Sequence, residues 1–308
     1  MNTITILMST YNGEKFLREQ LDSILTQKLP ANFELKILVR DDGSKDKTLD
    51  ILKEYEQNYG NTVSYYTGEN LKPAKSFWNL LNNCPTSDYY AFSDQDDVWF
   101  SDKLQRAIVA LQAEPNQSIP LLYSSNAVVT DENLNPLGVV ESCKKYTDLA
   151  HILIYNVSNG CTQVFNNCAK NEFVKFDMDS NLAIMHDRLA DLITAMFGKL
   201  IHDEEPSMYY RQHGNNVCGE QSIGKVKNFI KRVKRFLTSS YSIRSERCKM
   251  FLNLYGDKLT EGQRSLLYTV GYYATDKKAR KILMNDKAFS KGKKADFWLR
   301  WTVRLKKI

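Results

Sequence analysis

The chain of 308 residues lacks several features that would point to a membrane, secreted or zinc-binding protein. No stretch approaches the ~18 consecutive apolar residues of a membrane span. Residues 1–13 have neither the basic flank nor the long apolar core of a signal peptide. The six cysteines form no C-x-x-C pair, so neither a zinc site nor a disulfide framework is expected. We therefore expect a folded protein of the reducing cytoplasm.

Positive charge is scarce in most of the chain and concentrated at its end. Residues 225–308 hold 23 lysines and arginines against 6 acidic residues, a balance of +17. Because the net charge is +6, residues 1–224 carry −11. A basic region of this kind favours an anionic partner, such as membrane lipid, a phosphorylated carrier or nucleic acid. A solvated helical surface is the plain alternative.

Short apolar runs alternate with helical patterns through the first hundred residues. Strands are expected at 3–8, 35–39, 62–66 and 89–92, and helices at 14–27, 47–55 and 75–82. This alternation predicts an α/β fold, with a mainly parallel sheet flanked by helices. Polar or acidic residues follow three of the strands, at Ser9–Gly13, Asp41–Ser44 and Asp94–Asp97. Since ligands of such sheets bind at the carboxyl ends of the strands, we expect these loops to meet around one ligand.

The second half of the chain is less regular. Strands are expected at 121–129 and 160–165, a hairpin turn at 131–138, a helix at 184–197 and an extended segment at 208–213. From residue 222 onwards helical patterns predominate. We therefore predict a catalytic domain at residues 1–220 and a basic helical extension at residues 221–308.

Two segments of the extension combine an apolar stripe with many basic residues. The first is 226–237, and the second is the end of the chain, where Phe297, Trp298, Trp301 and Leu305 lie among lysines and arginines. Such patterns are typical of amphipathic helices that lie in a membrane interface. The apolar stripes and the terminal tryptophans favour lipid over nucleic acid as the partner. We therefore predict a peripheral protein at the inner face of the plasma membrane, with no nucleic-acid partner.

Three carboxylates, Asp94, Asp96 and Asp97, fall within four positions at the end of the fourth strand. Carboxylates this close repel one another, so a compensating charge is required. Oxygen ligands select Mg²⁺ or Mn²⁺, and a metal held there could neutralise a departing diphosphate. A solvated turn is the alternative for an isolated D-x-D pair. Its position after a buried strand, in register with two other polar loops, favours the metal site.

Five motifs in the order STYN, DDGSKDKT, SDQDDVW, MHD and YRQHGNN resemble those of the family 2 glycosyltransferases of the GT-A fold, over about residues 4–217. The SDQDDVW and MHD variants are most similar to bacterial rhamnosyltransferases of polysaccharide synthesis, of the streptococcal rhamnan α-1,3-rhamnosyltransferase type. The resemblance implies a metal-dependent, inverting enzyme that uses a nucleotide-activated sugar.

By motif position, the resemblance implies a nucleotide pocket formed by two loops. Thr10, Tyr11 and Asn12 would line the base pocket, with the Tyr11 ring available for stacking. Asp42 would accept the imide N–H of uracil or thymine. Both bases carry that donor, so Asp42 cannot distinguish UDP from dTDP. Lys72 stands where relatives often have glycine, so the loop before it is expected to differ from theirs.

The same mapping implies the residues that hold the diphosphate and the metal. Asp96 would be the direct metal ligand, and Asp94 would lie near both the ribose and the metal. His213 would ligate the metal or bond a phosphate oxygen, and Arg211 would be a further diphosphate contact.

The acceptor side of the site is implied by two further motifs. Asp97, Trp99 and His186 would border the sugar and the acceptor, although core packing is an equal alternative for Trp99. Asp187 falls where this family keeps its catalytic base. An inverting transfer needs such a base, because the acceptor hydroxyl must lose its proton as it attacks. A helix cap is the plain alternative for Asp187.

The donor sugar stays open between two interpretations. The first is L-rhamnose from dTDP-L-rhamnose, transferred to a saccharide acceptor carried on a lipid. The second is a UDP-hexose or UDP-N-acetylhexosamine used by the same fold. An inactive, membrane-docked scaffold is a remote alternative. The presence of Asp94, Asp96, Asp187 and His213 argues against it.

Overall fold

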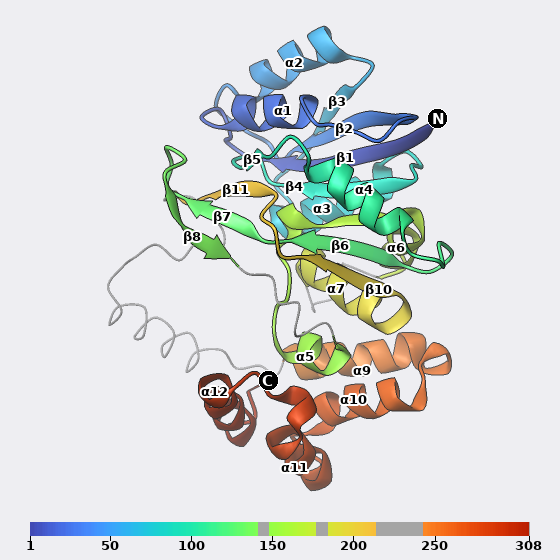
Figure 1. The fold of residues 1–308 in the computed structure, drawn as a ribbon. Helices are drawn as coiled ribbons and strands as arrows, with labels where there is room; N and C mark the ends of the chain where they lie inside the picture. The colour runs from blue at the N-terminus through green and yellow to red at the C-terminus, as the bar shows by residue number, and fades with distance from the viewer. Residues whose placement is uncertain (141–147, 177–183, 214–242, 308) are drawn as a thin grey trace. The chain divides into compact units, whose positions relative to one another are not determined.

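The computed structural model describes residues 1–140, 148–176, 184–213 and 243–307 (Figure 1). Two compact units divide the chain. The first comprises residues 1–145 and 157–213, and the second comprises residues 146–156 and 214–308. The boundary expected at residue 220 lies outside the described residues. The short stretch 146–156, within the predicted catalytic domain, belongs to the second unit.

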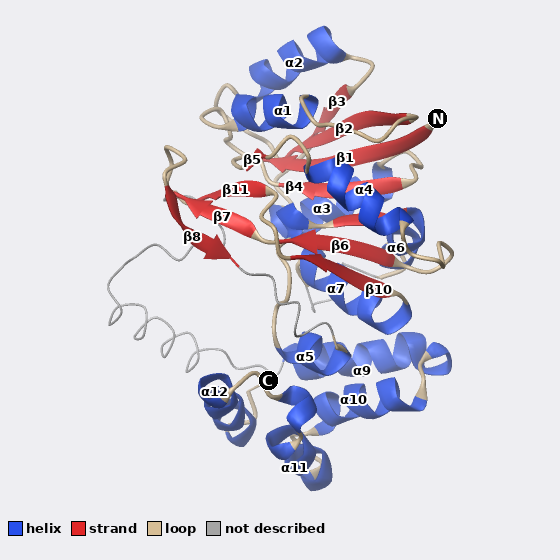
Figure 2. Ribbon diagram, in the orientation of Figure 1, coloured by secondary structure: helices blue, strands red, loops and turns tan. Residues whose placement is uncertain are grey.

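The first unit is built on a seven-stranded sheet in the order β10-β6-β9-β4-β1-β2-β3 (Figure 2). Its strands are β1 (Asn2–Thr10), β2 (Phe33–Asp41), β3 (Val63–Thr67), β4 (Tyr89–Ser93), β6 (Leu121–Ser125), β9 (Val164–Asn166) and β10 (Lys199–Asp203). Neighbours are parallel except around β9, which runs antiparallel to β4 and β6. The mainly parallel sheet predicted from the sequence is confirmed.

Helices cover both faces of this sheet. On one face, Leu21 of α1 and Leu104 of α4 share a core with Ile4 of β1. On the other face, Phe77 of α3 packs edge-on against Phe92 of β4, with ring centroids 5.4 Å apart. Each fully buried side chain of this size contributes roughly 1.5–3 kcal/mol. The helices are α1 (Leu17–Leu25), α2 (Thr48–Tyr59), α3 (Lys72–Asn83), α4 (Lys103–Gln112), α6 (Asn167–Phe173) and α7 (His186–Phe197).

A second, four-stranded sheet corrects one expectation of the sequence. Its order is β5-β11-β7-β8, formed by Val98–Trp99 (β5), Met208–Arg211 (β11), Ala127–Thr130 (β7) and Pro136–Val140 (β8). The single strand expected at 121–129 is wrong, because β6 and β7 belong to different sheets. They divide at Asn126, whose side-chain amide donates to the Glu204 carbonyl (2.6 Å) and whose N–H donates to the Asp203 carbonyl (3.1 Å).

The strand expected at 160–165 is also only partly correct. A 3₁₀ turn, η2, occupies Gly160–Thr162, and the strand β9 begins two residues later, at Val164. Alternation of apolar residues could not reveal this turn, because its three residues are all buried. The turn brings Gly160 and Cys161 to the carboxyl end of β4, beside the start of α7.

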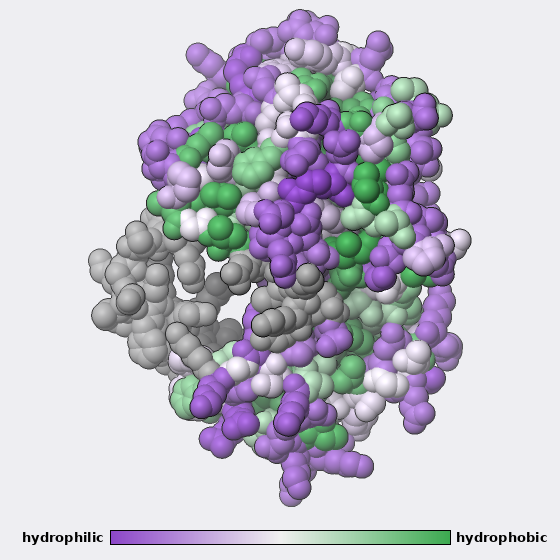
Figure 3. Space-filling view, in the orientation of Figure 1, coloured by the Kyte–Doolittle hydropathy of each residue, from purple (hydrophilic) through white to green (hydrophobic). Residues whose placement is uncertain are grey.

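The second unit is helical. It contains α5 (Leu149–Ile154), α9 (Ile243–Tyr255), η3 (Gly256–Lys258), α10 (Glu261–Tyr272), α11 (Lys277–Asn285), η4 (Lys287–Phe289) and α12 (Lys293–Arg304). A capping box at Thr260 starts α10, and the Asp276 side chain caps α11. Figure 3 shows hydrophilic residues along the edges of this unit, with more hydrophobic ones between them. The helix expected at 226–237 lies outside the described residues.

Among residues 1–140, 148–176, 184–213 and 243–307, none of the helices combines the length and the apolar character needed to cross a membrane.

Candidate active site

Three loops meet at the carboxyl ends of β1, β2 and β4, as the sequence predicts. These strands are adjacent and parallel, so their carboxyl ends lie at one edge of the sheet. Tyr11 N donates to Gln95 Oε1 (2.9 Å), and Gln95 Nε2 donates back to the Tyr11 carbonyl (3.1 Å). Asn12 N donates to Ser44 Oγ (2.9 Å), and Lys45 N donates to Asn12 Oδ1 (2.9 Å). The loop after β1 is therefore bonded to both of its neighbours.

The predicted base-pocket residues differ in what they offer a ligand. Tyr11 is 45% exposed, so its ring is available for stacking. Thr10 is buried, and its hydroxyl donates to Asp41 Oδ1 (3.2 Å). Asn12 is exposed and has a φ of 49°, and its N–H and its side-chain oxygen bond to Ser44 and Lys45 of the loop after β2. Thr10 and Asn12 therefore shape the loop that presents Tyr11.

Asp41 organises the loop after β2, although the sequence analysis gave it no role. Its Oδ2 accepts the N–H groups of Gly43 (3.0 Å) and Ser44 (2.9 Å), which is the bonding of an Asx turn. Gly43 has a φ of 79°, a conformation that favours glycine. The D-D-G-S sequence contains this signal, because an Asp two residues before a glycine is a common start of such a turn.

Asp42 is buried and held from two sides. The Arg40 guanidinium forms an ion pair with its Oδ1, and Lys72 N donates to its Oδ2 (3.0 Å). Burial lowers the pKa of Arg40. Lys72 itself has a φ of 68°, a left-handed conformation that a residue with a side chain rarely adopts. A glycine, which the family resemblance implies at this position, would adopt this conformation without strain, whereas Lys72 adopts it with a side chain.

The acidic cluster lies in the loop after β4. One ligand atom each from Asp94, Asp97 and Cys161 lies within 4.8 Å of the others. Burial, and then the charges of Asp96 and Asp187, raise the pKa of Asp94 to about 7. Asp97 is fully buried, and burial and the charge of Asp96 raise its pKa also. The positive groups around this loop therefore do not balance the charge that its carboxylates would carry when ionised.

A divalent cation fits this cluster. Asp97 Oδ2 is buried and has no hydrogen-bond partner among the described residues, while Asp94 keeps part of its surface accessible. Asp96 Oδ2 lies 2.7 Å from His213 Nε2, so the two predicted ligands are already adjacent. Cys161 is the less suitable donor. Burial raises the pKa of its thiol, and Mg²⁺ and Mn²⁺ prefer oxygen ligands.

Arg211 supports the cluster from beneath. Its N–H donates to Asp97 Oδ1 (3.1 Å), and its Nε donates to the Asp96 carbonyl (2.8 Å). Its Nη2 lies 2.5 Å from Glu19 Oε2, and the guanidinium stacks 4.4 Å from the Phe16 ring. Arg211 is only 2% exposed. Its contacts therefore indicate that it positions the acidic loop. The burial does not favour the predicted diphosphate contact.

Lys103 is a fully buried cation that the sequence analysis did not single out. Its Nζ donates to the Cys161 carbonyl (2.6 Å) and lies 4.3 Å from the centroid of the Trp99 ring. Burial lowers its pKa to about 8. Trp99 is 3% exposed and belongs to the hydrophobic core, so the packing alternative describes its place. The burial does not favour a direct acceptor contact for Trp99.

Asp187 and His186 begin α7 but have different surroundings. Asp187 is partly exposed, and its charge contributes to the raised pKa of Asp94. His186 is buried, with its ring stacked 3.8 Å from Phe77, and burial lowers its pKa to about 4. It is therefore a neutral ring inside an aromatic cluster, which does not favour the predicted acceptor contact.

Gly160 allows α7 to approach the cluster. A Cβ at this residue would lie 2.5 Å from His186 Nε2 and 3.3 Å from the Asp187 Cβ. Distances below 3 Å do not occur between such atoms, so any side chain here would displace the His186 ring or the helix that carries it. The absence of a side chain at Gly160 therefore helps to set where the carboxylate of Asp187 lies.

A family model and a curated relative match most of this chain. The model described as "Glycosyl transferase family 2" matches residues 5–196. The chain is 32% identical over 232 residues to the dTDP-rhamnosyl transferase RfbG of Shigella flexneri. That match covers 71% of this chain and 76% of that protein.

Solved structures are similar in fold. S. aureus TarS, residues 1–349, in complex with UDP-GlcNAc has a TM-score of 0.57 at 14% identity, over 100% of this chain and 93% of that chain. The mannosyltransferase PcManGT from Pyrobaculum calidifontis, in complex with GDP-Man and Mn²⁺, has a TM-score of 0.55 at 16% identity. It covers 98% of this chain and 73% of that chain. At these identities the likeness concerns the fold alone.

Proposed function

We propose a donor, a metal, a base and an acceptor for this chain, which belongs to glycosyl transferase family 2. Membership follows from the family match over residues 5–196 and from the 32% identity to a dTDP-rhamnosyl transferase. The chain is therefore a glycosyltransferase. Its mainly parallel sheet with flanking helices is the GT-A fold of its structural neighbours.

The proposed donor is dTDP-L-rhamnose. The similarity to the Shigella rhamnosyl transferase supports it. In this proposal the Tyr11 ring stacks on the base, and Asp42, fixed by Arg40, accepts its imide N–H. A UDP-hexose or UDP-N-acetylhexosamine is the second candidate, because uracil offers the same N–H.

The proposed cofactor is Mg²⁺ or Mn²⁺, held by Asp96, Asp94 and His213. The charge excess around Asp94 and the adjacency of Asp96 to His213 support this assignment. A bound cation would supply charge neutralisation for the departing diphosphate. Within the chain, Arg211 donates to the Asp96 carbonyl and to the Asp97 carboxylate, so the acidic loop is held before a donor arrives.

The proposed catalytic base is Asp187. The observation that supports this role is the position of its carboxylate near Asp94. Asp187 is a partly exposed carboxylate close enough to Asp94 for its charge to raise the pKa of that group. A base beside the donor site can take the proton of an acceptor hydroxyl as its oxygen attacks the anomeric carbon. Attack from the face opposite the leaving diphosphate inverts the anomeric centre.

The proposed acceptor is a saccharide on a lipid carrier, in the synthesis of a cell-surface polysaccharide. The enzyme would then act as a peripheral protein at the inner face of the plasma membrane. Asp97 is buried and accepts the Arg211 N–H, Trp99 packs against Lys103, and His186 stacks on Phe77. In this proposal these three residues shape the acceptor side from below rather than contacting the sugar.

A donor screen tests the proposal. Purified protein would be incubated with dTDP-L-rhamnose and a panel of UDP-sugars, with Mn²⁺ and with excess EDTA, and the released nucleoside diphosphate would be measured. We expect release from dTDP-L-rhamnose in Mn²⁺ that Asp187→Asn slows strongly. Release from a UDP-sugar alone would replace the donor assignment. Equal release in EDTA would exclude the metal.

A further inference from the structure

The last helix of the second unit, α12, has three distinct faces. Leu299 and Val303 are buried against the unit. Phe297 is 62% exposed and Leu305 is 47% exposed, and the tryptophans at 298 and 301 are 36% and 38% exposed. At 100° per residue these four side chains share one stripe, opposite Leu299 and Val303. The third face is basic and lies between the other two, with Lys293, Arg300 and Arg304.

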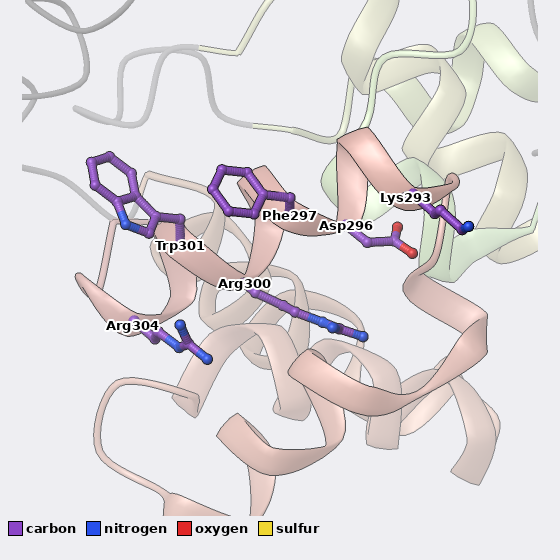
Figure 4. Close-up of a pocket in the computed structure, with 6 residues that line it drawn as sticks. All are labelled: Lys293, Asp296, Phe297, Arg300, Trp301 and Arg304. Atoms are coloured by element: carbon purple, nitrogen blue, oxygen red, sulfur yellow. The ribbon is translucent and has the colours of Figure 1, made fainter.

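Figure 4 shows how the apolar and basic faces adjoin. The rings of Phe297 and Trp301 point to the same side of the helix, and the side chains of Arg300 and Arg304 extend away from them. With Lys293 and Asp296, these residues line one pocket. A cationic edge beside an aromatic stripe matches the two layers of a bilayer interface, which are phosphate and acyl chain.

Hydrogen bonds within the second unit hold α12 in this orientation. Asp296 Oδ2 accepts the Ser290 hydroxyl (2.6 Å), and its Oδ1 accepts Lys291 N (2.9 Å). Arg300 Nε donates to the Met284 carbonyl (3.1 Å). Asp296 is the single acidic residue of 291–307, and it is engaged in these bonds. The seven lysines and arginines of the same stretch leave a balance of +6.

The apolar stripe of α12 is contiguous and exposed to solvent, which is unusual for a protein surface that binds nothing. Single exposed apolar residues are common on proteins, but contiguous ones mark an interaction site. We propose that the α12 face binds an anionic lipid bilayer, with Phe297, Trp301 and Leu305 entering the interface and Lys293 and Arg304 at the level of the phosphates. The charge of the stretch is complementary to acidic lipid. Tryptophan and phenylalanine are favoured at this depth.

This inference deepens the membrane location in the proposed function, but its test measures binding without sugar transfer. Full-length protein would be sedimented with vesicles of phosphatidylcholine, and with vesicles containing phosphatidylglycerol, at low and high salt. We expect binding to the anionic vesicles that weakens as salt screens the charges. Absence of binding to anionic vesicles at low salt would overturn the proposal, as would equal binding to both vesicle types.

Variants separate the two faces. The pair Phe297→Ser with Trp301→Ser should reduce binding to anionic vesicles at least roughly tenfold, because both rings leave the interface. The pair Lys293→Gln with Arg304→Gln should reduce it about thirtyfold at low salt and much less at high salt. Leu254→Ser is the matched control, since Leu254 is a 51% exposed residue of α9 in the same unit. It should bind as the wild type does.

The outcomes are distinguishable from those of the donor screen. If the Phe297→Ser, Trp301→Ser variant keeps its melting temperature and its donor hydrolysis but leaves the vesicles, the proposal is supported. If it binds vesicles as the wild type does, α12 is not the binding face. If the same variants lose binding to RNA instead, with no vesicle binding by the wild type, the partner is nucleic acid. Vesicle binding by a protein that hydrolyses no donor would remove the proposed function and leave this inference standing.

Discussion

His213 Nε2 lies 2.7 Å from Asp96 Oδ2, although the two residues are 117 positions apart in the chain. Both were predicted as metal ligands from their motifs, and the fold brings their donor atoms together. Packing of the His213 ring 4.9 Å from the Phe16 ring holds it in place. A pair of this geometry can close around a cation without a large movement of either side chain.

The first prediction follows from that pair. Asp96→Ala should lose Mn²⁺ affinity and transfer, because it removes the ligand that His213 faces. Isothermal titration with Mn²⁺ and a rate assay would measure both. Asp102→Ala is the control, since it removes a half-exposed carboxylate just before α4 and should leave both values unchanged. Full transfer by Asp96→Ala, or by the wild type in excess EDTA, contradicts the metal role.

The second prediction concerns Asp42 and its partner Arg40. Asp42→Asn should raise the donor KM more than it lowers kcat, because the lost bond serves ground and transition states alike. It should also destabilise the fold, because Arg40 loses its ion-pair partner and keeps only its hydrogen bonds to Ser76 Oγ and the Glu69 carbonyl. Adding Arg40→Met should restore much of the stability but none of the donor affinity. A KM that recovers together with the melting temperature would mean that Asp42 is only structural.

Much of this arrangement could be predicted from the sequence, for a physical reason. The strands β1, β2 and β4 each contain a short apolar run, and polar residues follow each one, so strand ends and loops were evident without a structure. Their adjacency follows from the rules of parallel sheets. The D-x-D motif follows the apolar run of β4, and the MHD motif begins the helical pattern of α7.

The features that the sequence did not predict depend on contacts between distant parts of the chain. Burial of His186, Trp99 and Arg211 depends on partners far away in the chain, such as Phe77 and Glu19, which local patterns do not contain. The buried Lys103 resembles a surface lysine in sequence, because only tertiary packing removes it from water. The division of 121–129 between two sheets depends on contacts of Asn126 with residues 203–207.

The third prediction uses the left-handed backbone of Lys72. Lys72→Gly should stabilise the protein by about 0.5–1 kcal/mol. Relief of the left-handed conformation is worth roughly 1–2 kcal/mol, and the added freedom of the unfolded chain offsets part of it. The side chain is exposed, so few contacts are lost. Thermal melts of Lys72→Gly and Lys72→Ala make the comparison, and alanine should give no comparable gain. A Gly variant that melts below the wild type contradicts the assignment.

The fourth prediction is a pH dependence of stability at Asp191. This residue is buried, accepts Ser158 Oγ (2.6 Å), and has its pKa raised to about 7, chiefly by burial. The charge of Asp187 also raises it, and that of Arg188 lowers it. Between its ordinary pKa of 3.8 and about 7, the folded state binds a proton that the unfolded state has released. The Asp191 contribution should therefore fall as the pH rises through this range.

Asp191→Asn removes that titration and keeps an acceptor for Ser158. Melts of both proteins at pH 4 to 8, in EDTA, should show a wild type that loses stability relative to the variant as the pH rises. Each unit of pKa difference corresponds to about 1.4 kcal/mol. Parallel stability curves for the two proteins would mean that Asp191 has an ordinary pKa.

The fifth prediction decides the catalytic base. An acceptor hydroxyl is a poor nucleophile at neutral pH, and a positioned carboxylate that takes its proton contributes ~10²–10⁴-fold. Asp187→Asn keeps the size of the side chain and an oxygen for the Arg188 N–H, which Asp187 Oδ1 accepts at 2.6 Å. The variant should therefore remain folded, bind metal and nucleotide normally, and lose transfer by about that factor.

A helix cap predicts the opposite result for the same variant: a loss of about 1 kcal/mol or less in stability, with nearly normal transfer. Met185, the N-cap residue of α7, makes no side-chain capping bond, whereas Asp187 Oδ1 accepts the Arg188 N–H in the first turn. A melting curve, a nucleotide titration and a transfer rate on one sample separate the two. Asp50→Asn, in the first turn of α2, is the control for an acidic residue at a helix start. If Asp187→Asn transfers sugar as fast as that control, another group takes the proton. Asp97 would then be a poor substitute, because it is fully buried and its Oδ1 accepts Arg211 N.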